Sequence, residues 1–291
     1  MPYPRPLKRN PDFSRDDYIQ ITPENAGWEH LYFSARKIGK DKSWVSETGD
    51  TEMVVVILGG TAEFQSNRKS WRKIGRRLDV FSGMPYAVYI PRETKFELRA
   101  ISEELDIGYG WTKTDEDHPI QLITPEMVSI EIRGGGNVTR QINSIIPPGF
   151  DCHKLVVVEV YTPSGNWSSY PPHKHDRHQV DEDGNLIEAD LEEIYFYKID
   201  KPNGFAYQRI YTDDGSIDEL LLVQDSQLVL SPEGYHPVVS APGYNTYYLN
   251  FLAGTAQVLT ASDDPNHAWV KETFDTKDPR VPIVTMDMEA E

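Results

Sequence analysis

The apolar residues of this chain fall in short runs rather than in the 3.6-residue period of an amphipathic helix. Residues 54–58 (VVVIL) end at Gly59-Gly60, and residues 61–65 resume as a second run. Two such runs joined by glycine predict a β-hairpin. Further strands are predicted over residues 28–38, 87–91, 95–100, 105–111, 155–161, 193–199, 205–211, 217–223, 227–230 and 247–252. The chain is therefore predicted to be all-β.

The pattern repeats along the chain. Residues 54–64 can be laid against residues 193–206, each as strand, glycine-containing turn and strand, and residues 86–98 can be laid against residues 228–238. This suggests two related β-barrels, separated by the proline corner at residues 145–149 (IIPPG). The predicted division is an N-terminal barrel over residues 1–148, a C-terminal barrel over residues 149–270 and a tail over residues 271–291.

Charge narrows the function. Lysine and arginine number 29 and aspartate and glutamate number 46, which gives a net charge of −17 over 291 residues. Such a surface repels phosphate backbones and anionic lipid, so nucleic-acid and membrane binding are not expected. A small anionic substrate would need a local basic group or a metal ion.

One cysteine, Cys152, allows no intramolecular disulfide, and we interpret it as a packing residue. The first twelve residues lack an apolar signal segment, and no apolar run approaches the roughly 20 residues of a membrane helix. We therefore expect a cytoplasmic protein. Exposed barrel edges would allow a homo-oligomer.

Candidate chemistry begins at His173 and His175 in the segment YPPHKHD. On an extended strand, positions i and i+2 point to the same face, so the two imidazoles would converge while Lys174 faces away. Imidazoles bind zinc, manganese and iron. The spacing therefore predicts a metal site.

A glutamate and a third histidine complete the predicted ligand set. Glu193 begins the strand 193–199, and Glu192 would face the opposite way, so Glu193 is preferred and Glu192 is the alternative. His236 follows in PEGYHP. The first half has no histidines at the corresponding places, so only the second barrel is expected to bind metal. The other histidines are interpreted as ordinary core or surface residues: His30, His118, His153, His178 and His267.

Other chemistries find no support in the sequence. No serine–histidine–acid set and no dinucleotide fingerprint stand out. The three glycines at 134–136 lack the preceding strand and following helix of a phosphate-binding loop, and are interpreted as a bend between strands.

The histidine pair, later glutamate and Pro-x-Gly segment ending in histidine resemble the cupin pattern. Two departures stand out. About seventeen residues separate His175 from Glu193 where many cupins have a few, which indicates a loop insertion. One residue, rather than two, separates Gly234 from His236.

Most of the chain resembles a narrower family, the 5-deoxy-glucuronate isomerases of bacterial inositol catabolism. The strings that carry this resemblance are RGGGNVTR (133–140), PSGNWSSYPPHKHD (163–176), EEIY (192–195), GFAYQR (204–209), PEGYHP (232–237) and YYLN (247–250). The resemblance implies a bicupin whose C-terminal barrel holds the metal. It also implies an aldose–ketose isomerase, an intramolecular oxidoreductase that interconverts 5-deoxy-D-glucuronate and 5-dehydro-2-deoxy-D-gluconate.

For such a reaction we expect a divalent cofactor, zinc or manganese, because no redox change is needed. Glu193 or a metal-bound water is the expected base. Gln208, Arg209 and Tyr248 are the candidate substrate-binding residues, and of Gln208 and Arg209 only one can face the interior, since they are adjacent in a strand.

Three alternatives remain open at this point. The 4-deoxy-L-threo-5-hexosulose-uronate ketol-isomerases of pectin breakdown share the same plan. An Fe(II) cupin dioxygenase would use the same ligands, and a sugar-binding cupin would use the same fold without turnover.

Overall fold

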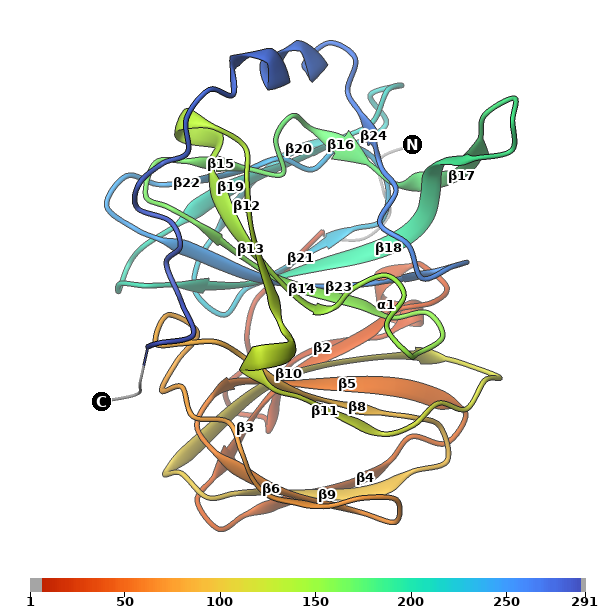
Figure 1. The fold of residues 1–291 in the computed structure, drawn as a ribbon, viewed down its shortest axis with the longest axis vertical. Helices are drawn as coiled ribbons and strands as arrows, with labels where there is room; N and C mark the ends of the chain where they lie inside the picture. Colours follow the sequence, from red (N-terminus) through yellow and green to blue (C-terminus); the bar gives the residue numbers. More distant parts are fainter. Residues whose placement is uncertain (1–6, 289–291) are drawn as a thin grey trace.

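A computed structural model describes residues 7–288 and shows two β-barrels stacked on each other (Figure 1). The first half of the chain, red to yellow, forms the lower barrel, and the second half forms the upper one. Across residues 7–288, helical structure is limited to α1 (Pro23–Ala26), η1 (Pro125–Met127), η2 (Gly136–Val138) and η3 (Ala268–Thr273). The prediction of an all-β fold with two barrels is confirmed. No helix within these residues is both long and apolar enough to span a membrane.

The first barrel consists of two antiparallel sheets. The six-stranded sheet has the order β11 (Gln121–Ile123), β8 (Tyr86–Ile90), β5 (Thr51–Gly59), β10 (Glu104–Lys113), β3 (Tyr32–Gly39) and β2 (Asp17–Ile21). The four-stranded sheet has the order β4 (Ser43–Glu47), β9 (Lys95–Ala100), β6 (Ala62–Ser66) and β7 (Trp71–Ile74). Apolar side chains, Trp44, Phe64 and Phe96 among them, fill the interior. The first barrel is therefore a packed core.

The second barrel is built around an eight-stranded sheet. Its order is β1 (Lys8–Arg9), β21 (Leu228–Ser231), β18 (Leu186–Ile199), β23 (Thr246–Gly254), β14 (Val156–Thr162), β13 (Arg140–Ile146) and β12 (Ser129–Arg133), with β17 (Asp176–Val180) paired to β18. A four-stranded sheet has the order β15 (Trp167–Ser168), β22 (Val238–Ser240), β19 (Ala206–Tyr211) and β20 (Asp218–Val223). Strands β16 (His173–Lys174) and β24 (Ser262–Asp263) form a separate pair.

The two barrels share one strand arrangement. Strands β5 to β10 occupy the same sheet positions in the first barrel as β18 to β23 in the second. This agrees with the repeat found in the sequence. The strands do not divide at residue 148, however, because β12, β13 and the N-terminal β1 all join the sheet of the second barrel.

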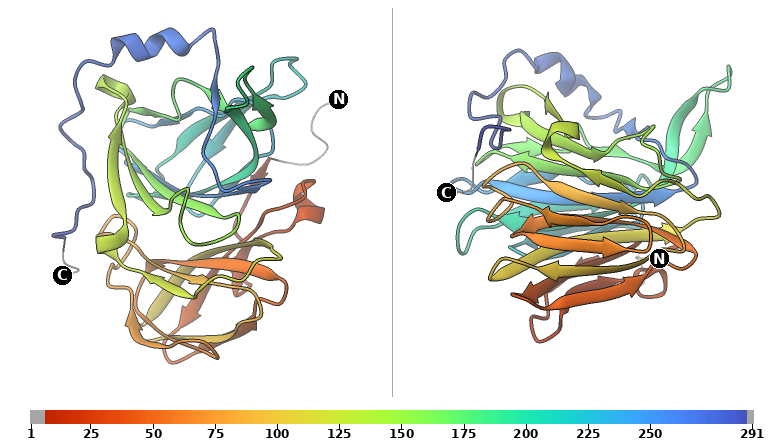
Figure 2. Two further views of the ribbon diagram at one scale, coloured as in Figure 1. Left: turned by 45° about the vertical axis from the view of Figure 1, so that its right-hand side comes forward. Right: turned by 60° about the horizontal axis from the view of Figure 1, so that its bottom comes forward.

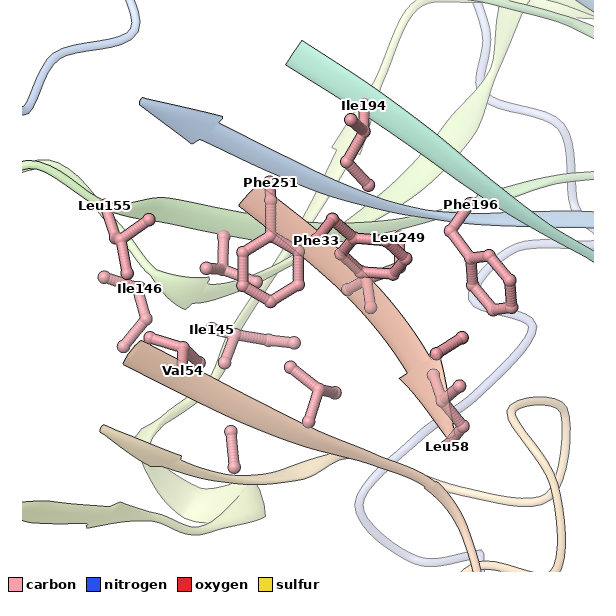
Figure 3. Packing of buried hydrophobic residues seen from close by; sticks show 14 of the residues in the cluster. Phe33, Val54, Leu58, Ile145, Ile146, Leu155, Ile194, Phe196, Leu249 and Phe251 are labelled. Carbon is pink, nitrogen blue, oxygen red and sulfur yellow. The ribbon is translucent and has the colours of Figure 1, made fainter. Parts of the chain in front are cut away.

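The large sheets of the two barrels pack against each other through a shared apolar core (Figure 3). Val54 and Leu58 of β5 contribute to this core together with Phe196 of β18 and Phe251 of β23. The intervening Val55 of β5 points into the first barrel instead. Successive strand residues face opposite sides, so a strand buried on both sides has the continuous apolar run seen at residues 54–58.

Several strands escape the apolar pattern. β2, β4 and β7 were not predicted from the sequence. Only Trp44 of β4 and Ile74 of β7 are buried, whereas β2 buries Tyr18, Ile19 and Ile21. The loop insertion predicted between His175 and Glu193 is largely a hairpin, since β18 begins at Leu186 and pairs with β17. Strands that are solvated over most of their surface need no apolar alternation, so pattern alone does not reveal them.

Each barrel also binds backbone groups of the other. Glu52 of β5 accepts hydrogen bonds of 2.7–3.0 Å from the backbone N–H groups of residues 153–155. Glu192 of β18 accepts hydrogen bonds from the N–H groups of residues 29–31. Both carboxylates are buried. The two contacts are reciprocal and fix the barrels relative to each other.

A buried ion pair adds to this interface. Arg77 of the first barrel lies 3.1 Å from Glu159 of β14, and both side chains are almost wholly buried. Tyr247 donates a hydrogen bond to the same carboxylate, as does Asn143. The charge is therefore paired and hydrogen-bonded, which a buried charge requires.

The C-terminal segment runs along one side of both barrels (Figure 2). The backbone N–H of Ile283 donates to Gln141 Oε1 of β13, at 2.6 Å, and Arg76 of the first barrel donates to the carbonyl of Met286. The tail predicted to begin at residue 271 therefore lies against both domains.

Candidate metal centre

The second barrel encloses a cavity of about 470 Å³. Its floor is formed by inward-facing residues of four adjacent strands: Arg140, Ile142 and Ser144 of β13, Val158 and Val160 of β14, Tyr248, Asn250 and Leu252 of β23, and Glu193 and Tyr195 of β18. The two-residue spacing in each strand is that of one sheet face. The cavity therefore lies on the side of the sheet opposite the core shared with the first barrel.

Three potential metal ligands meet in this barrel. The ligand atoms of His175, Glu193 and His236 all lie within 4.8 Å of one another, and all three residues are buried. Glu193 Oε2 is 3.0 Å from His175 Nε2 and 3.4 Å from His236 Nε2. Among residues 7–288, this is the one group of three or more histidine, cysteine or acidic side chains with such spacing.

Backbone carbonyls fix the orientation of the imidazoles. Nδ1 of His175 lies 3.1 Å from the carbonyl of Leu191, and Nδ1 of His236 lies 2.9 Å from that of Gly234. Nδ1 of His173 lies 3.3 Å from the carbonyl of Pro171. A proton on Nδ1 leaves Nε2 with its lone pair, as in histidines that bind metals.

The surroundings set the protonation of these rings. Burial lowers the pKa of His173 to about 3, with contributions from the charges of His175 and Arg140. Burial also lowers the pKa of His236 to about 3. Burial opposes protonation of His175 too, but the hydrogen bond and charge of Glu193 outweigh it and raise its pKa. Two of the three rings are therefore neutral near pH 7.

The residues fit a divalent cation. His236 Nε2 is buried and has no hydrogen-bond partner, which is costly for a polar atom unless something binds it. Two imidazoles and a carboxylate form a nitrogen–oxygen donor set of the kind that holds zinc, manganese or iron. The group could therefore bind a metal ion.

The remaining residues of the predicted set lie close by or face elsewhere. His173 lines the cavity with its ring centroid 5.0 Å from that of His236, but it is not part of the three-residue group. Glu192 faces the first barrel. Lys174 forms ion pairs with Asp176 and Asp213 instead of lining the cavity.

Of the three predicted substrate-binding residues, only Tyr248 lines the cavity. Its hydroxyl is hydrogen-bonded to Ser168 and lies 3.4 Å from Ser169 Oγ. Gln208 points into the barrel but contacts Tyr197 there instead of the cavity. Arg209 projects from the outer face of β19 and pairs with Asp218, so it does not reach the cavity.

The other histidines lie outside the site. They occupy loops or surface strands at His30, His118, His153, His178 and His267.

Sequence reasoning overlooked Arg140. It is the first residue of β13, it is buried, and it lines the same cavity as Glu193. Arg140 ends the string RGGGNVTR. The sequence could have indicated that Arg140 faces the barrel interior only if the first residue of β13 had been known.

The chain that follows β23 contributes part of the cavity wall. Leu259, Asp263, Lys271 and Phe274 line it. Gly135 lies directly under Phe274, and a Cβ at this glycine would approach Phe274 Cα to 2.7 Å. Phe274 therefore packs on the glycine bend at residues 134–136. The bend joins the paired strands β12 and β13, as predicted, but β12 directly precedes it and the short 3-10 helix η2 begins within it.

Comparison with known proteins identifies relatives that all belong to one family. The model of the KduI/IolB family matches residues 7–270. A 5-deoxy-glucuronate isomerase of Geobacillus thermodenitrificans is 42% identical over 256 residues, which cover 88% of this chain and 91% of that protein. A 5-deoxy-glucuronate isomerase of Bacillus subtilis strain 168 is 36% identical over 255 residues, covering 87% of this chain and 92% of that protein.

Solved structures agree with the fold. An IolB-like protein of Salmonella typhimurium LT2 superposes with a TM-score of 0.87 at 34% identity, covering 91% of this chain and 99% of that chain. The oxalate decarboxylase of Lactobacillus farciminis superposes with a TM-score of 0.61 at 8% identity, covering 90% of both chains. At this identity the similarity supports the two-barrel fold but says nothing about function.

Proposed function

The chain belongs to the KduI/IolB family, and we propose on that basis that it is a metal-dependent 5-deoxy-glucuronate isomerase. The reaction interconverts 5-deoxy-D-glucuronate and 5-dehydro-2-deoxy-D-gluconate in myo-inositol catabolism. The observation that carries the proposal is the convergence of His175, Glu193 and His236 beside a cavity large enough for a sugar acid, which His175 and Glu193 line. The identity of the substrate is inferred from the names of the relatives, which are 5-deoxy-glucuronate isomerases.

The metal ligands in this proposal are His175, Glu193 and His236, with His173 as the fourth. A divalent ion held there, zinc or manganese, would act as a Lewis acid on the sugar carbonyl and its neighbouring hydroxyl. The isomerisation needs no change of oxidation state in the ion, so a redox-inactive metal suffices.

Glu193 is the proposed base. Its Oε2 is directed at the two imidazoles, whereas no hydrogen bond within residues 7–288 engages Oε1. Because Glu193 lines the cavity, Oε1 can accept the proton from the carbon that bears the hydroxyl and return it to the neighbouring carbon, while the hydroxyl proton passes to the former carbonyl oxygen. One carboxylate oxygen thus orients the site while the other transfers the proton.

Tyr248 is the proposed donor to a substrate oxygen. Burial raises the pKa of its hydroxyl, so the side chain stays neutral and can donate a hydrogen bond. Ser168 and Ser169 hold the hydroxyl at the cavity surface. A neutral donor at this place stabilises the negative charge that develops when the carbon loses its proton.

The test combines metal analysis with an isomerase assay on 5-deoxy-glucuronate. We expect about one metal ion per chain, loss of activity with a chelator, and recovery with zinc or manganese. His236→Ala should lose the metal and lower kcat/KM by more than about 100-fold. Replacing a residue that only hydrogen-bonds to a metal ligand already costs about 10- to 100-fold, so loss of a ligand should cost more. His267→Ala, at a histidine outside the cavity, is the control.

Other outcomes would contradict the proposal. Retention of metal and activity in both His173→Ala and His236→Ala would show that the ligands are elsewhere. Turnover of a 4-deoxy-hexosulose uronate in preference to 5-deoxy-glucuronate would favour the pectin-breakdown isomerases. Oxygen consumption would favour a dioxygenase, and saturable sugar binding without turnover would favour a binding protein.

A further inference from the structure

Arg140 is an unpaired cation in the floor of the cavity that the metal-binding group adjoins. Only 8% of the residue is exposed, and its Nη1 donates one hydrogen bond, of 3.3 Å, to the carbonyl of Tyr170. Within residues 7–288, no carboxylate lies at ion-pair distance from it. Since a buried charge ordinarily has a charged partner, this guanidinium has capacity for an anion.

The other two cations that line the cavity, Arg133 and Lys271, are more exposed than Arg140 and are paired with carboxylates. Arg133 forms two hydrogen bonds to Glu131, of 2.7 and 2.8 Å, and its side chain is half exposed. Lys271 is paired with Asp263. Each of these has its charge satisfied by the protein, whereas Arg140 does not.

Burial lowers the pKa of the Arg140 guanidinium. Arginine nevertheless stays protonated at neutral pH because its ordinary pKa is above 12. The site therefore holds a full positive charge with little water around it, and its remaining N–H groups are suited to the planar fork of a carboxylate. Such a charge also overcomes, locally, the repulsion of an anion by a chain of net charge −17.

The position of Arg140 relative to the metal-binding group suits a molecule with two different ends. Glu193 lies on β18 and Arg140 on β13, with β23 and β14 between them in the sheet. All four strands contribute to the floor of one cavity. A six-carbon uronic acid likewise has its reactive carbonyl at one end and its carboxylate at the other.

We propose that Arg140 binds the carboxylate of the substrate and so restricts the enzyme to sugar acids with the carbonyl directed at Glu193. This rests on the proposed isomerase function of the same cavity. Tyr170, whose carbonyl accepts from Arg140, keeps the guanidinium directed into the cavity. Neutral sugars of the same length enter without this contact.

The experiment compares D-glucuronate with D-glucose. The two sugars differ at one position, where glucuronate has a carboxylate and glucose has a hydroxymethyl group. Calorimetric binding of each is measured with the metal-loaded full chain and with Arg140→Met and Arg140→Lys. Arg133→Met is the matched control, a cavity arginine already paired with Glu131. Circular dichroism and metal content establish that each variant is folded and loaded, and we expect folding because Arg140→Met removes one hydrogen bond and no ion pair.

We expect the wild-type chain to prefer glucuronate and Arg140→Met to lose about 10- to 100-fold of that preference, with glucose binding unchanged. Arg140→Lys should retain part of it, and Arg133→Met should change it less than threefold. With 5-deoxy-glucuronate as substrate, Arg140→Met should lower kcat/KM by a similar factor.

The two proposals fail separately. A wild-type chain that does not isomerise 5-deoxy-glucuronate overturns the proposed function, while the binding comparison still tests Arg140. An active enzyme in which Arg140→Met keeps its preference for glucuronate, or loses affinity for glucose equally, overturns the role of Arg140 alone. Absence of any preference in the wild-type chain overturns it as well.

Discussion

Glu192 and Glu193 are adjacent in β18, yet their carboxylates lie on opposite sides of the sheet. Glu193 Oε2 faces His175 and His236 in the second barrel. Glu192 accepts hydrogen bonds from backbone N–H groups of residues 29–31 in the first barrel. One glutamate therefore belongs to the site, and its neighbour joins the two barrels.

This relationship predicts opposite effects for two matched substitutions. Glu193→Gln should lower activity by more than about 100-fold and weaken metal binding, because an amide is a poorer ligand and no base. Glu192→Gln should retain the metal but lower the free energy of unfolding by about 2–3 kcal/mol, since hydrogen bonds to a charged acceptor contribute about 1.5–3 kcal/mol each and the amide keeps one acceptor oxygen. Metal content and urea unfolding of both variants decide this, and equal metal loss in the two would contradict it.

The interface between the barrels predicts a strong dependence on the Arg77–Glu159 pair. Glu159→Gln leaves Arg77 buried without its counter-charge and should lower the free energy of unfolding by about 3–5 kcal/mol. The double variant Arg77→Met/Glu159→Leu should be less destabilised than the sum of its single changes, because neither charge remains. A double-mutant cycle in urea measures the coupling, and additive losses would show that the pair does not act as a unit.

The packing of Phe274 on Gly135 predicts an effect at a distance from the ligands. Gly135→Ala places a methyl group within 3 Å of Phe274 backbone atoms, so the segment that lines the cavity must shift. We expect faster proteolysis in residues 274–288 and a several-fold higher KM, with metal content unchanged. Gly39→Ala controls for the loss of a glycine, because Gly39 has no positive φ and a Cβ there would meet nothing within 4 Å. Equal proteolysis in the two variants would show that the segment does not depend on this contact.

Stability should depend on pH through His118. Burial opposes its protonation, but hydrogen bonds to Asp151 and Glu116 outweigh this and raise its pKa. A histidine with a raised folded-state pKa stabilises the fold fully below its unfolded pKa of about 6.5, and the contribution is lost as pH rises through the higher folded value. His118→Gln should therefore cost about 0.5 kcal/mol at pH 6, as partly exposed pairs do, and less at pH 9. An equal or larger cost at pH 9 would contradict the sign.

The sequence by itself determined much of this protein. Runs such as residues 54–58 indicate strands because a strand buried on both faces must be apolar throughout. The hairpin predicted across Gly59-Gly60 is wrong, because β5 and β6 belong to different sheets and do not pair with each other. The two-residue period of a strand predicts that His173 and His175 face the same side and that Glu192 and Glu193 face opposite sides. Both histidines do line the cavity, although only His175 belongs to the three-residue group. Apolar runs and strand alternation are local properties, so residue order alone carries them.

The tertiary structure decided what depends on strands far apart in the chain. Arg140 joins Glu193 in one cavity only because β13, β14, β23 and β18 are neighbours in a sheet, and no local pattern encodes that order. Arg209 is separated from the cavity by the direction in which β19 faces, and alternation alone left Gln208 and Arg209 equivalent. Alternation tells which residues share a face, but the packing of the sheets decides which face surrounds the site.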